Sequence, residues 1–229
     1  MNQKLNPQMN PHMDPKSSLP PSFCIDSDAK NVREKAARLT ACLNGARDKA
    51  RKLFDYVRDE IRYNFAPAVY ERSHFKASHA LELGNGFCMQ KAALYAALCR
   101  AAGIPARIGF QHLVDYKIVG PFYDMLGGNE LDNHGMNAIY LDGRWIAVDA
   151  TLDRALCERK NYRLVEFDGR HDALLPKTDR DGKPHFTIQK QKAFYNDTPQ
   201  FAMRTFLYWV KNMPYDDWRN LVHRKRGSM

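Results

Sequence analysis

Cys88 is the residue of this sequence best placed to act as a nucleophile. It follows the glycine-rich stretch Gly84-Asn85-Gly86 and opens a long segment of apolar and small residues. Such a segment predicts a helix whose first turn has free backbone N–H groups and the positive end of the helix dipole, both of which favour a thiolate. Most free cysteines are inert core residues, so this position alone leaves a structural role open.

A histidine and an aspartate downstream supply the groups that would activate this thiol. Asp142-Gly143 lies between two alternating apolar segments, which predicts a two-residue hairpin turn. The register of that hairpin makes His134 and Asp149 diagonal neighbours on one face, about 7–8 Å apart at the backbone. An acid beside a histidine fixes its tautomer and leaves the other ring nitrogen for a thiol. A structural ion pair between the two side chains remains an alternative.

The elements that must position these residues are one helix and an antiparallel hairpin. The segment from Phe87 to about Ala102 is apolar almost all round, which is typical of an enclosed central helix. Gly103-Ile104-Pro105 ends it, and Cys99 inside it is interpreted as a packing residue. Strands are predicted over residues 106–113, 135–141 and 144–149.

Further elements follow from apolar periodicity and turn signals. Ser27 is a candidate N-cap for a helix that ends at Asn44-Gly45, and Ser78 is one for a short helix through Leu83. The other predicted elements are a helix over 46–61, loops over 63–76 and 114–133, edge strands over 162–167 and 185–188, and helices over 201–210 and 215–222. The loop over 114–133 is long enough to serve as a lid or specificity loop.

Three regions are expected along the chain. Residues 1–25 have little apolar periodicity and are predicted to form a mobile N-terminal arm. Residues 26–155 form the predicted catalytic core. Residues 156–229 form a predicted C-terminal extension packed on that core, ending in the basic tail His223-Arg224-Lys225-Arg226.

Composition narrows the class of protein. The chain has 229 residues, of which 44% are hydrophobic and 27% are charged, as in ordinary globular domains. No secretory signal is visible, and no apolar run approaches the roughly 18 residues of a membrane helix. Five cysteines without paired short spacing argue against a disulfide framework and fit a reducing compartment, so we expect a cytoplasmic protein.

The net charge of +9 is concentrated toward the C-terminus, but it stands beside no recognisable motif for reading nucleic acid. We therefore do not expect nucleic-acid binding. The residues need neither a metal nor an organic cofactor. Cys88, His134 and Asp149 could ligate zinc in principle, but they lack the local pairing typical of zinc sites.

Three sequence blocks resemble the transglutaminase-like superfamily. They are Gly86-Phe87-Cys88 with the downstream run Leu98-Cys99-Arg100-Ala101-Ala102-Gly103-Ile104-Pro105-Ala106-Arg107, then His134, then the block from Asp142 to Thr151. The resemblance covers about residues 50–151. It implies an α+β papain-like core in which the cysteine-bearing helix packs on an antiparallel sheet, with Cys88, His134 and Asp149 as a triad.

Members of that family transfer acyl groups from amides through a thioester. The resemblance therefore implies hydrolysis, deamidation or crosslinking of a peptide- or protein-derived amide, and we favour hydrolysis. Two positions depart from the pattern, because many members have an aromatic residue and an acid where this chain has Met136 and Asn137. The backbone N–H of Cys88, after Gly86, and the hydroxyl of Tyr63 are candidate oxyanion donors.

Two other functions remain open from the sequence. One is a non-catalytic interaction module on the same fold that uses its basic C-terminal part to hold a partner. The other is acyl transfer from a coenzyme-A thioester, which needs the same three groups. The sequence does not indicate the oligomeric state.

Overall fold

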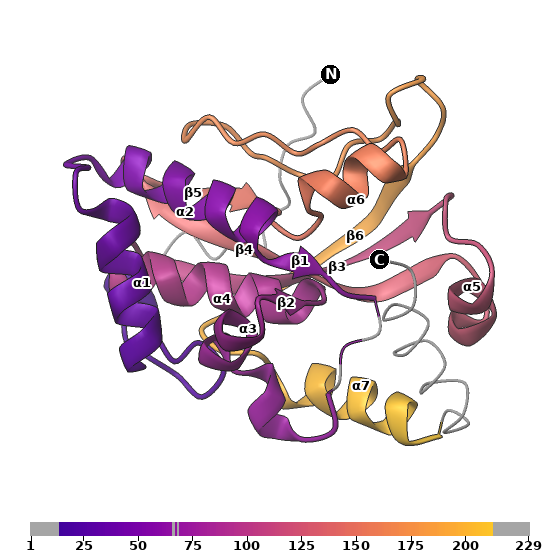
Figure 1. Ribbon diagram of the computed structural model, residues 1–229, viewed down its shortest axis with the longest axis horizontal. Helices are drawn as coiled ribbons and strands as arrows, with labels where there is room; N and C mark the ends of the chain where they lie inside the picture. Colours follow the sequence, from indigo (N-terminus) through magenta and orange to yellow (C-terminus); the bar gives the residue numbers. More distant parts are fainter. Residues whose placement is uncertain (1–13, 66, 68, 213–229) are drawn as a thin grey trace.

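A four-stranded antiparallel sheet and one buried helix form the centre of the molecule. The computed structural model describes residues 14–65, 67 and 69–212. The sheet has the order β5-β4-β3-β6, and Figure 1 shows α4 running alongside it. The strands are β3 (Ala106–Asp115), β4 (Glu130–Leu141), β5 (Arg144–Val148) and β6 (Phe186–Tyr195).

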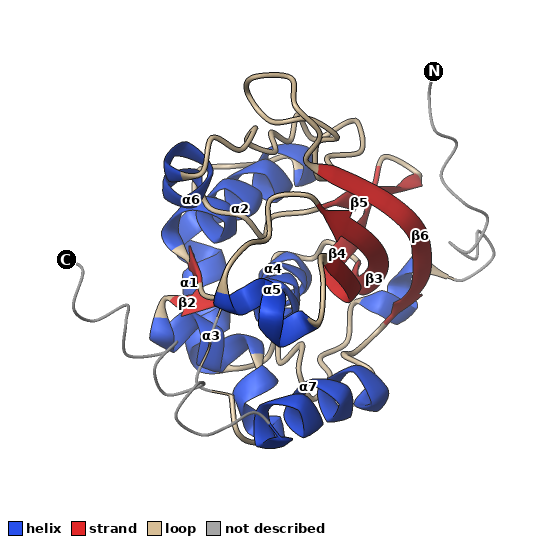
Figure 2. Ribbon diagram, turned by 90° about the vertical axis from the view of Figure 1, so that its right-hand side faces the viewer, coloured by secondary structure: helices blue, strands red, loops and turns tan. Residues whose placement is uncertain are grey.

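Helix α4 (Cys88–Ala101) is enclosed as its composition predicts. All its residues from Cys88 to Arg100 are buried, and its alanines allow neighbouring elements to approach closely. The sheet covers one side of α4, and α1 (Lys30–Thr40), α2 (Ala46–Glu60) and α3 (Ala77–Leu83) cover the other (Figure 2). A helix in this position can hold a reactive group at a fixed place, because it has contacts on all sides.

The remaining elements are short or peripheral. They are η1 (Pro15–Ser18), β1 (Arg62–Tyr63), η2 (Arg72–Phe75), β2 (Asn85–Gly86), α5 (Pro121–Leu126), α6 (Arg154–Arg159) and α7 (Gln200–Asn212). Strands β1 and β2 form a parallel pair, which the sequence did not reveal. No helix among the described residues is both long and apolar enough to cross a membrane.

The predicted hairpin is confirmed. Asp142 and Gly143 have φ values of 50° and 82°, which a two-residue turn of this kind requires at both positions. The pairing of β4 with β5 begins at Leu141 and Arg144, and it continues to Asn137 and Val148. This is the register predicted from the turn.

Both predicted serine caps were wrong. Helix α1 begins at Lys30 because residues 26–29 form a turn in which the N–H of Ala29 donates to the carbonyl of Asp26. Helix α3 begins at Ala77, one residue before Ser78. The carboxylate of Asp26 accepts both the N–H and the hydroxyl of Ser78, so it satisfies the first turn of α3 from outside.

The predicted N-terminal arm is wrong for its described part. Cys24 and Ile25 are fully buried, and the N–H of Cys24 donates to Asp197 at 2.9 Å. The guanidinium of Arg100 donates to the carbonyl of Pro20 at 2.7 Å, which ties this segment to α4. Residues 1–13 of the predicted arm lie outside the described residues.

The predicted boundary near residue 155 does not divide the sheet, because β6 pairs along β3 as a full member of it. No strand forms over 162–167, although Tyr162, Val165 and Phe167 are buried in the core. The predicted strand over 185–188 is the start of the longer β6, and the helix over 201–210 is α7. The predicted helix over 215–222 and the basic tail lie outside the described residues.

The two predicted loops contain regular structure. Tyr63 ends β1, and η2 lies within the loop predicted over 63–76. The connection predicted over 114–133 is shorter, because β3 extends to Asp115 and β4 starts at Glu130, with α5 between them.

Candidate active site

Cys88 is the first residue of α4 and is 8% exposed. The side chain of Gln90 folds back over this helix start: its amide oxygen accepts the N–H of Phe87 at 3.2 Å, and its amide group donates to the carbonyl of His74. A Cβ on Gly86 would come within 2.9 Å of the Cβ of Gln90, so glycine is needed for this approach. The glycine turn therefore serves to fix the helix start that carries the thiol.

The hairpin brings His134 and Asp149 into direct contact. The Nε2 atom of His134 lies 2.7 Å from a carboxylate oxygen of Asp149. Both side chains are almost fully buried, with 4% and 1% of each residue exposed. The diagonal arrangement inferred from the turn thus occurs in the structure, and it leaves the Nδ1 atom of His134 for another partner.

The other carboxylate oxygen of Asp149 is held by Thr151. It accepts the backbone N–H of Thr151 at 3.1 Å and the hydroxyl at 2.6 Å. Sequence reasoning missed this role of Thr151. The signal was present, because aspartate often accepts the N–H of the residue two positions later in an Asx-turn.

The side chain of Cys88 lies close enough to the His134 imidazole to help raise the pKa of that imidazole. Burial opposes a charge on this imidazole, but the Asp149 carboxylate outweighs burial and raises the pKa of His134 from 6.5 to about 10. The next residue, Gly135, allows this contact: a Cβ there would lie only 3.1–3.2 Å from backbone atoms of Cys88 and Met89. Strand β4 can therefore approach the start of α4 more closely than a larger residue would allow.

Tyr63, at the end of β1, is a further residue of the site. The β1–β2 pair places Tyr63 opposite Gly86, two residues before Cys88. Its hydroxyl lies beside Cys88 and interacts with both the backbone N–H and the side chain of that residue. Burial of the hydroxyl, the charge of Cys88 and the charge of Asp149 all raise the pKa of Tyr63 well above its usual value. Tyr63 therefore keeps its proton and can donate a hydrogen bond.

The arrangement joins a thiol, an imidazole, a carboxylate and two hydrogen-bond donors. Such a set can form a thiolate, attack a carbonyl and stabilise the resulting oxyanion. Within the described part of the chain, no three or more His, Cys, Asp or Glu residues form a group that could hold a metal ion. Both carboxylate oxygens of Asp149 are hydrogen-bonded within the site, one to His134 and the other to Thr151.

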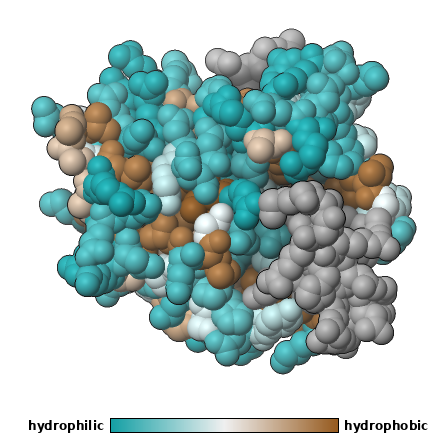
Figure 3. Space-filling view, in the orientation of Figure 1, coloured by the Kyte–Doolittle hydropathy of each residue, from teal (hydrophilic) through white to brown (hydrophobic). Residues whose placement is uncertain are grey.

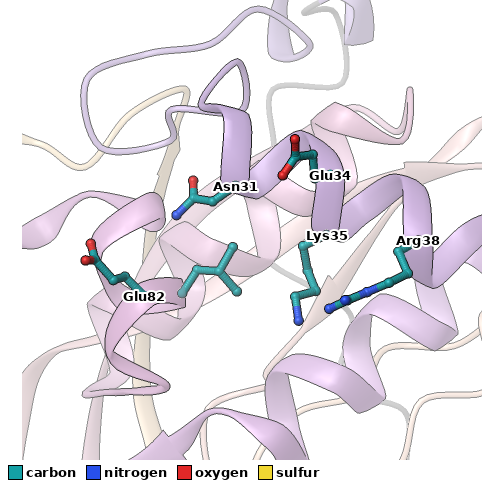
Figure 4. Close-up of a pocket in the computed structure, with 6 residues that line it drawn as sticks. Asn31, Glu34, Lys35, Arg38 and Glu82 are labelled. Carbon is teal, nitrogen blue, oxygen red and sulfur yellow. The ribbon is translucent and has the colours of Figure 1, made fainter.

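A separate open pocket of about 600 Å³ lies between α1 and α3. Its lining is mostly charged, as Figure 4 shows, and consists of Asn31, Glu34, Lys35, Arg38, Leu81 and Glu82. None of these residues belongs to the candidate site. The face that carries β1 and β2 is mostly hydrophilic with hydrophobic patches near its centre (Figure 3).

Comparison with known proteins decides the family. The model of the transglutaminase-like superfamily matches residues 33–150, slightly more than half of the chain. The chain belongs to the transglutaminase-like superfamily. The match confirms the resemblance seen in the sequence, and the fold is the α+β, papain-like arrangement of that family, with the cysteine-bearing helix packed on an antiparallel sheet.

The chain is also similar to individual proteins and solved structures over part of its length. Human kyphoscoliosis peptidase is 27% identical over 118 residues, which are 48% of this chain and 16% of the human protein. The chain thus spans about a sixth of the length of that relative. A candidate cysteine protease from Cytophaga hutchinsonii aligns with a TM-score of 0.47 and 20% identity, over 80% of this chain and 55% of that one. The periplasmic domain of TgpA from Pseudomonas aeruginosa aligns with a TM-score of 0.41 and 21% identity, over 61% and 48%.

Proposed function

We propose that this protein is a cysteine-dependent enzyme that transfers acyl groups from amides through a thioester, with Cys88, His134 and Asp149 as its catalytic triad. The observation that carries the proposal is the contact chain from Asp149 through the His134 imidazole to the Cys88 thiol at a helix start. A merely structural ion pair would not need a thiol on the free side of the histidine. The placement of a tyrosine hydroxyl beside the same thiol adds support.

The chemistry follows from these contacts. His134 takes the thiol proton, and the Cys88 sulfur forms a bond to the carbonyl carbon of the amide. The N–H of Cys88 and the hydroxyl of Tyr63 stabilise the negative oxygen. The carbon–nitrogen bond then breaks as His134 returns the proton to the leaving amine. Water attacks the thioester with His134 again as base, which releases a carboxylic acid and restores the thiol.

We propose peptide-like amides as substrates and water as the usual acceptor. The human relative is named a peptidase, which supports this substrate class although the chain corresponds to a small part of that protein. We also propose a cytoplasmic location, because all five cysteines are free and four of them are buried.

The test compares two cysteines of the same helix. Cys88→Ala should abolish both acyl-adduct formation with a peptide library and alkylation by iodoacetamide at this site, as read by intact mass. Cys99→Ala should leave both unchanged, because Cys99 is fully buried and its pKa is raised to about 12 by that burial, against the opposing effects of Tyr95 and Arg100. Equal loss in both variants would contradict the assignment. Slow, pH-insensitive alkylation of Cys88 would instead favour the non-catalytic interaction module.

A further inference from the structure

A buried lysine lies directly beneath the candidate site. Lys91 is one helical turn after Cys88 and has no exposed surface. Its ammonium group donates to the carbonyl oxygen of Arg58 at 3.1 Å and to that of Ile61. The proposed chemistry uses no such group. Burying a lysine is costly, and an apolar side chain would fill the same space, so its hydrogen bonds require an explanation.

The carbonyls that Lys91 binds both lie at the C-terminal end of α2. Arg58 lies in the last turn of α2, and Ile61 is its C-cap. Carbonyls at a helix end have no partner within the helix, and a cation or N–H donor there is favourable. Ile61 stands two residues before Tyr63. Lys91 thus connects the helix that carries the thiol to the chain segment that carries the tyrosine.

An aspartate holds the same segment from the other side. One carboxylate oxygen of Asp153 accepts the N–H of Tyr63 at 2.6 Å. The other oxygen accepts the N–H of Leu156 at 2.7 Å and so caps α6. Asp153 is 4% exposed. Tyr63 is therefore fixed through its own backbone N–H and through the carbonyl of the residue two positions before it.

We propose that Lys91 and Asp153 are positioning residues that hold the Tyr63 hydroxyl over Cys88, where it acts as the second oxyanion donor. This inference rests on the proposed function. Lys91 and Asp153, which we call the tyrosine brace, touch neither the thiol nor the imidazole in any contact described above. They act through Tyr63, because Asp153 accepts its backbone N–H and Lys91 binds carbonyls of the residues just before it.

The hydrogen bonds of the brace do not depend on the charge of Lys91. Burial lowers the pKa of Lys91 to about 7, with Asp153 and Asp149 opposing that effect. A neutral amine still carries two N–H groups, which is the number of carbonyls that it binds. The informative change is therefore Lys91→Met, which keeps the length of the side chain and removes every donor.

Two reactions of Cys88 separate positioning of Tyr63 from damage to the thiol. Acylation by p-nitrophenyl acetate develops an oxyanion, whereas alkylation by iodoacetamide does not. Removing one oxyanion donor typically costs about 10²–10³-fold in rate. We expect Tyr63→Phe to lower kcat for acylation about a hundredfold and Lys91→Met to lower it at least tenfold. In both variants KM should stay within about twofold of the wild type, and the alkylation rate should fall at least tenfold less than the acylation rate, because alkylation develops no oxyanion.

The decisive measurement is the double variant. If Lys91 acts through Tyr63, Lys91→Met should cause less than about a twofold further loss in a Tyr63→Phe background. Losses that multiply would overturn the proposal, and so would unchanged acylation in Lys91→Met or a parallel fall in alkylation. The control is Lys52→Met on the exposed side of α2, which should change neither rate.

Folding and the underlying chemistry are checked separately. If a thermal melt shows that Lys91→Met does not fold, Asp153→Asn replaces it and is subject to the same outcomes. Asparagine can keep the bond to Leu156 through its oxygen while its amide group faces the N–H of Tyr63. If Cys88→Ala reacts with the ester as fast as the wild type, the proposed function fails, whatever the brace variants do.

Discussion

Replacing Asp149 by asparagine should trap His134 in the wrong tautomer. The backbone N–H of Thr151 donates to one carboxylate oxygen of Asp149 at 3.1 Å, so that position must stay an oxygen in the asparagine. The amide NH₂ then faces the Nε2 atom of His134, which must accept a hydrogen bond. The proton of the neutral imidazole moves to Nδ1, the atom that should accept the proton of the Cys88 thiol.

The expected loss of activity is large, because Asp149 both orients the imidazole and stabilises its charged form. Burial lowers the pKa of His134, but Asp149, with a smaller contribution from Cys88, raises it from 6.5 to about 10, so the carboxylate strongly favours the imidazolium. The same substitution in a serine-protease triad costs about 10⁴-fold in rate, or about 5.5 kcal/mol. We therefore expect Asp149→Asn to reduce acylation of Cys88 by p-nitrophenyl acetate between 10³- and 10⁴-fold.

The assay measures p-nitrophenol release and iodoacetamide alkylation from pH 5 to 10, with the folded fraction of each variant determined by thermal melting. The comparison variant is Asp149→Ala, which loses the carboxylate but leaves either tautomer of His134 available. Although Asp149→Ala should be the less stable of the two, its folded molecules should react faster. Loss of less than about tenfold in Asp149→Asn would refute the tautomer argument, as would equal rates in the two variants.

The remaining predictions concern the parts that hold the triad. Gly135→Ala should lower acylation about tenfold, because its Cβ would push β4 from the start of α4 by a few tenths of an ångström; Gly45→Ala, which has room, should have no effect. Thr151→Val, which removes the 2.6 Å bond but keeps the backbone N–H, should lower acylation about tenfold and slow alkylation. In a Cys88→Ala background the contribution of Cys88 is gone, but Asp149 still raises the pKa of His134, so the fold is stabilised fully below pH 6.5 and loses this stabilisation as the pH rises through the folded-state pKa. Chemical denaturation should show that fall, by less than about 5 kcal/mol, and a further Asp149→Asn change should remove it.

The sequence predicted the site better than it predicted the edges of the fold. Two turn residues with positive φ fixed the register of the hairpin, and the period of two along a strand then determined which side chains share a face. The contact between His134 and Asp149 is therefore a consequence of local geometry over about 15 residues. Helix α4 was equally predictable, because its composition leaves no polar side to face solvent.

The missed features depend on contacts between distant segments. The β1–β2 pair joins two-residue strands more than 20 positions apart, and such short strands have no detectable period. The carboxylate of Asp153 accepts the N–H of Tyr63 across 90 positions. Residues 162–167 show that apolar positions predict burial without predicting a strand, since Tyr162, Val165 and Phe167 are buried in the core while this segment forms no strand.

The two departures from the family pattern do not weaken the proposed chemistry, because both residues have structural tasks. Met136 is fully buried in a small cluster with Ala138, Ala147 and Phe194 on the sheet. The amide group of Asn137 donates to the carbonyl of Ala92 in α4 at 2.9 Å and to that of Arg107 in β3 at 3.1 Å. An ionised acid at this position has no proton for either carbonyl. In this chain Asn137, three residues after the histidine on β4, ties β4 to the thiol-bearing helix α4 and to β3. These bonds hold His134 in place relative to Cys88.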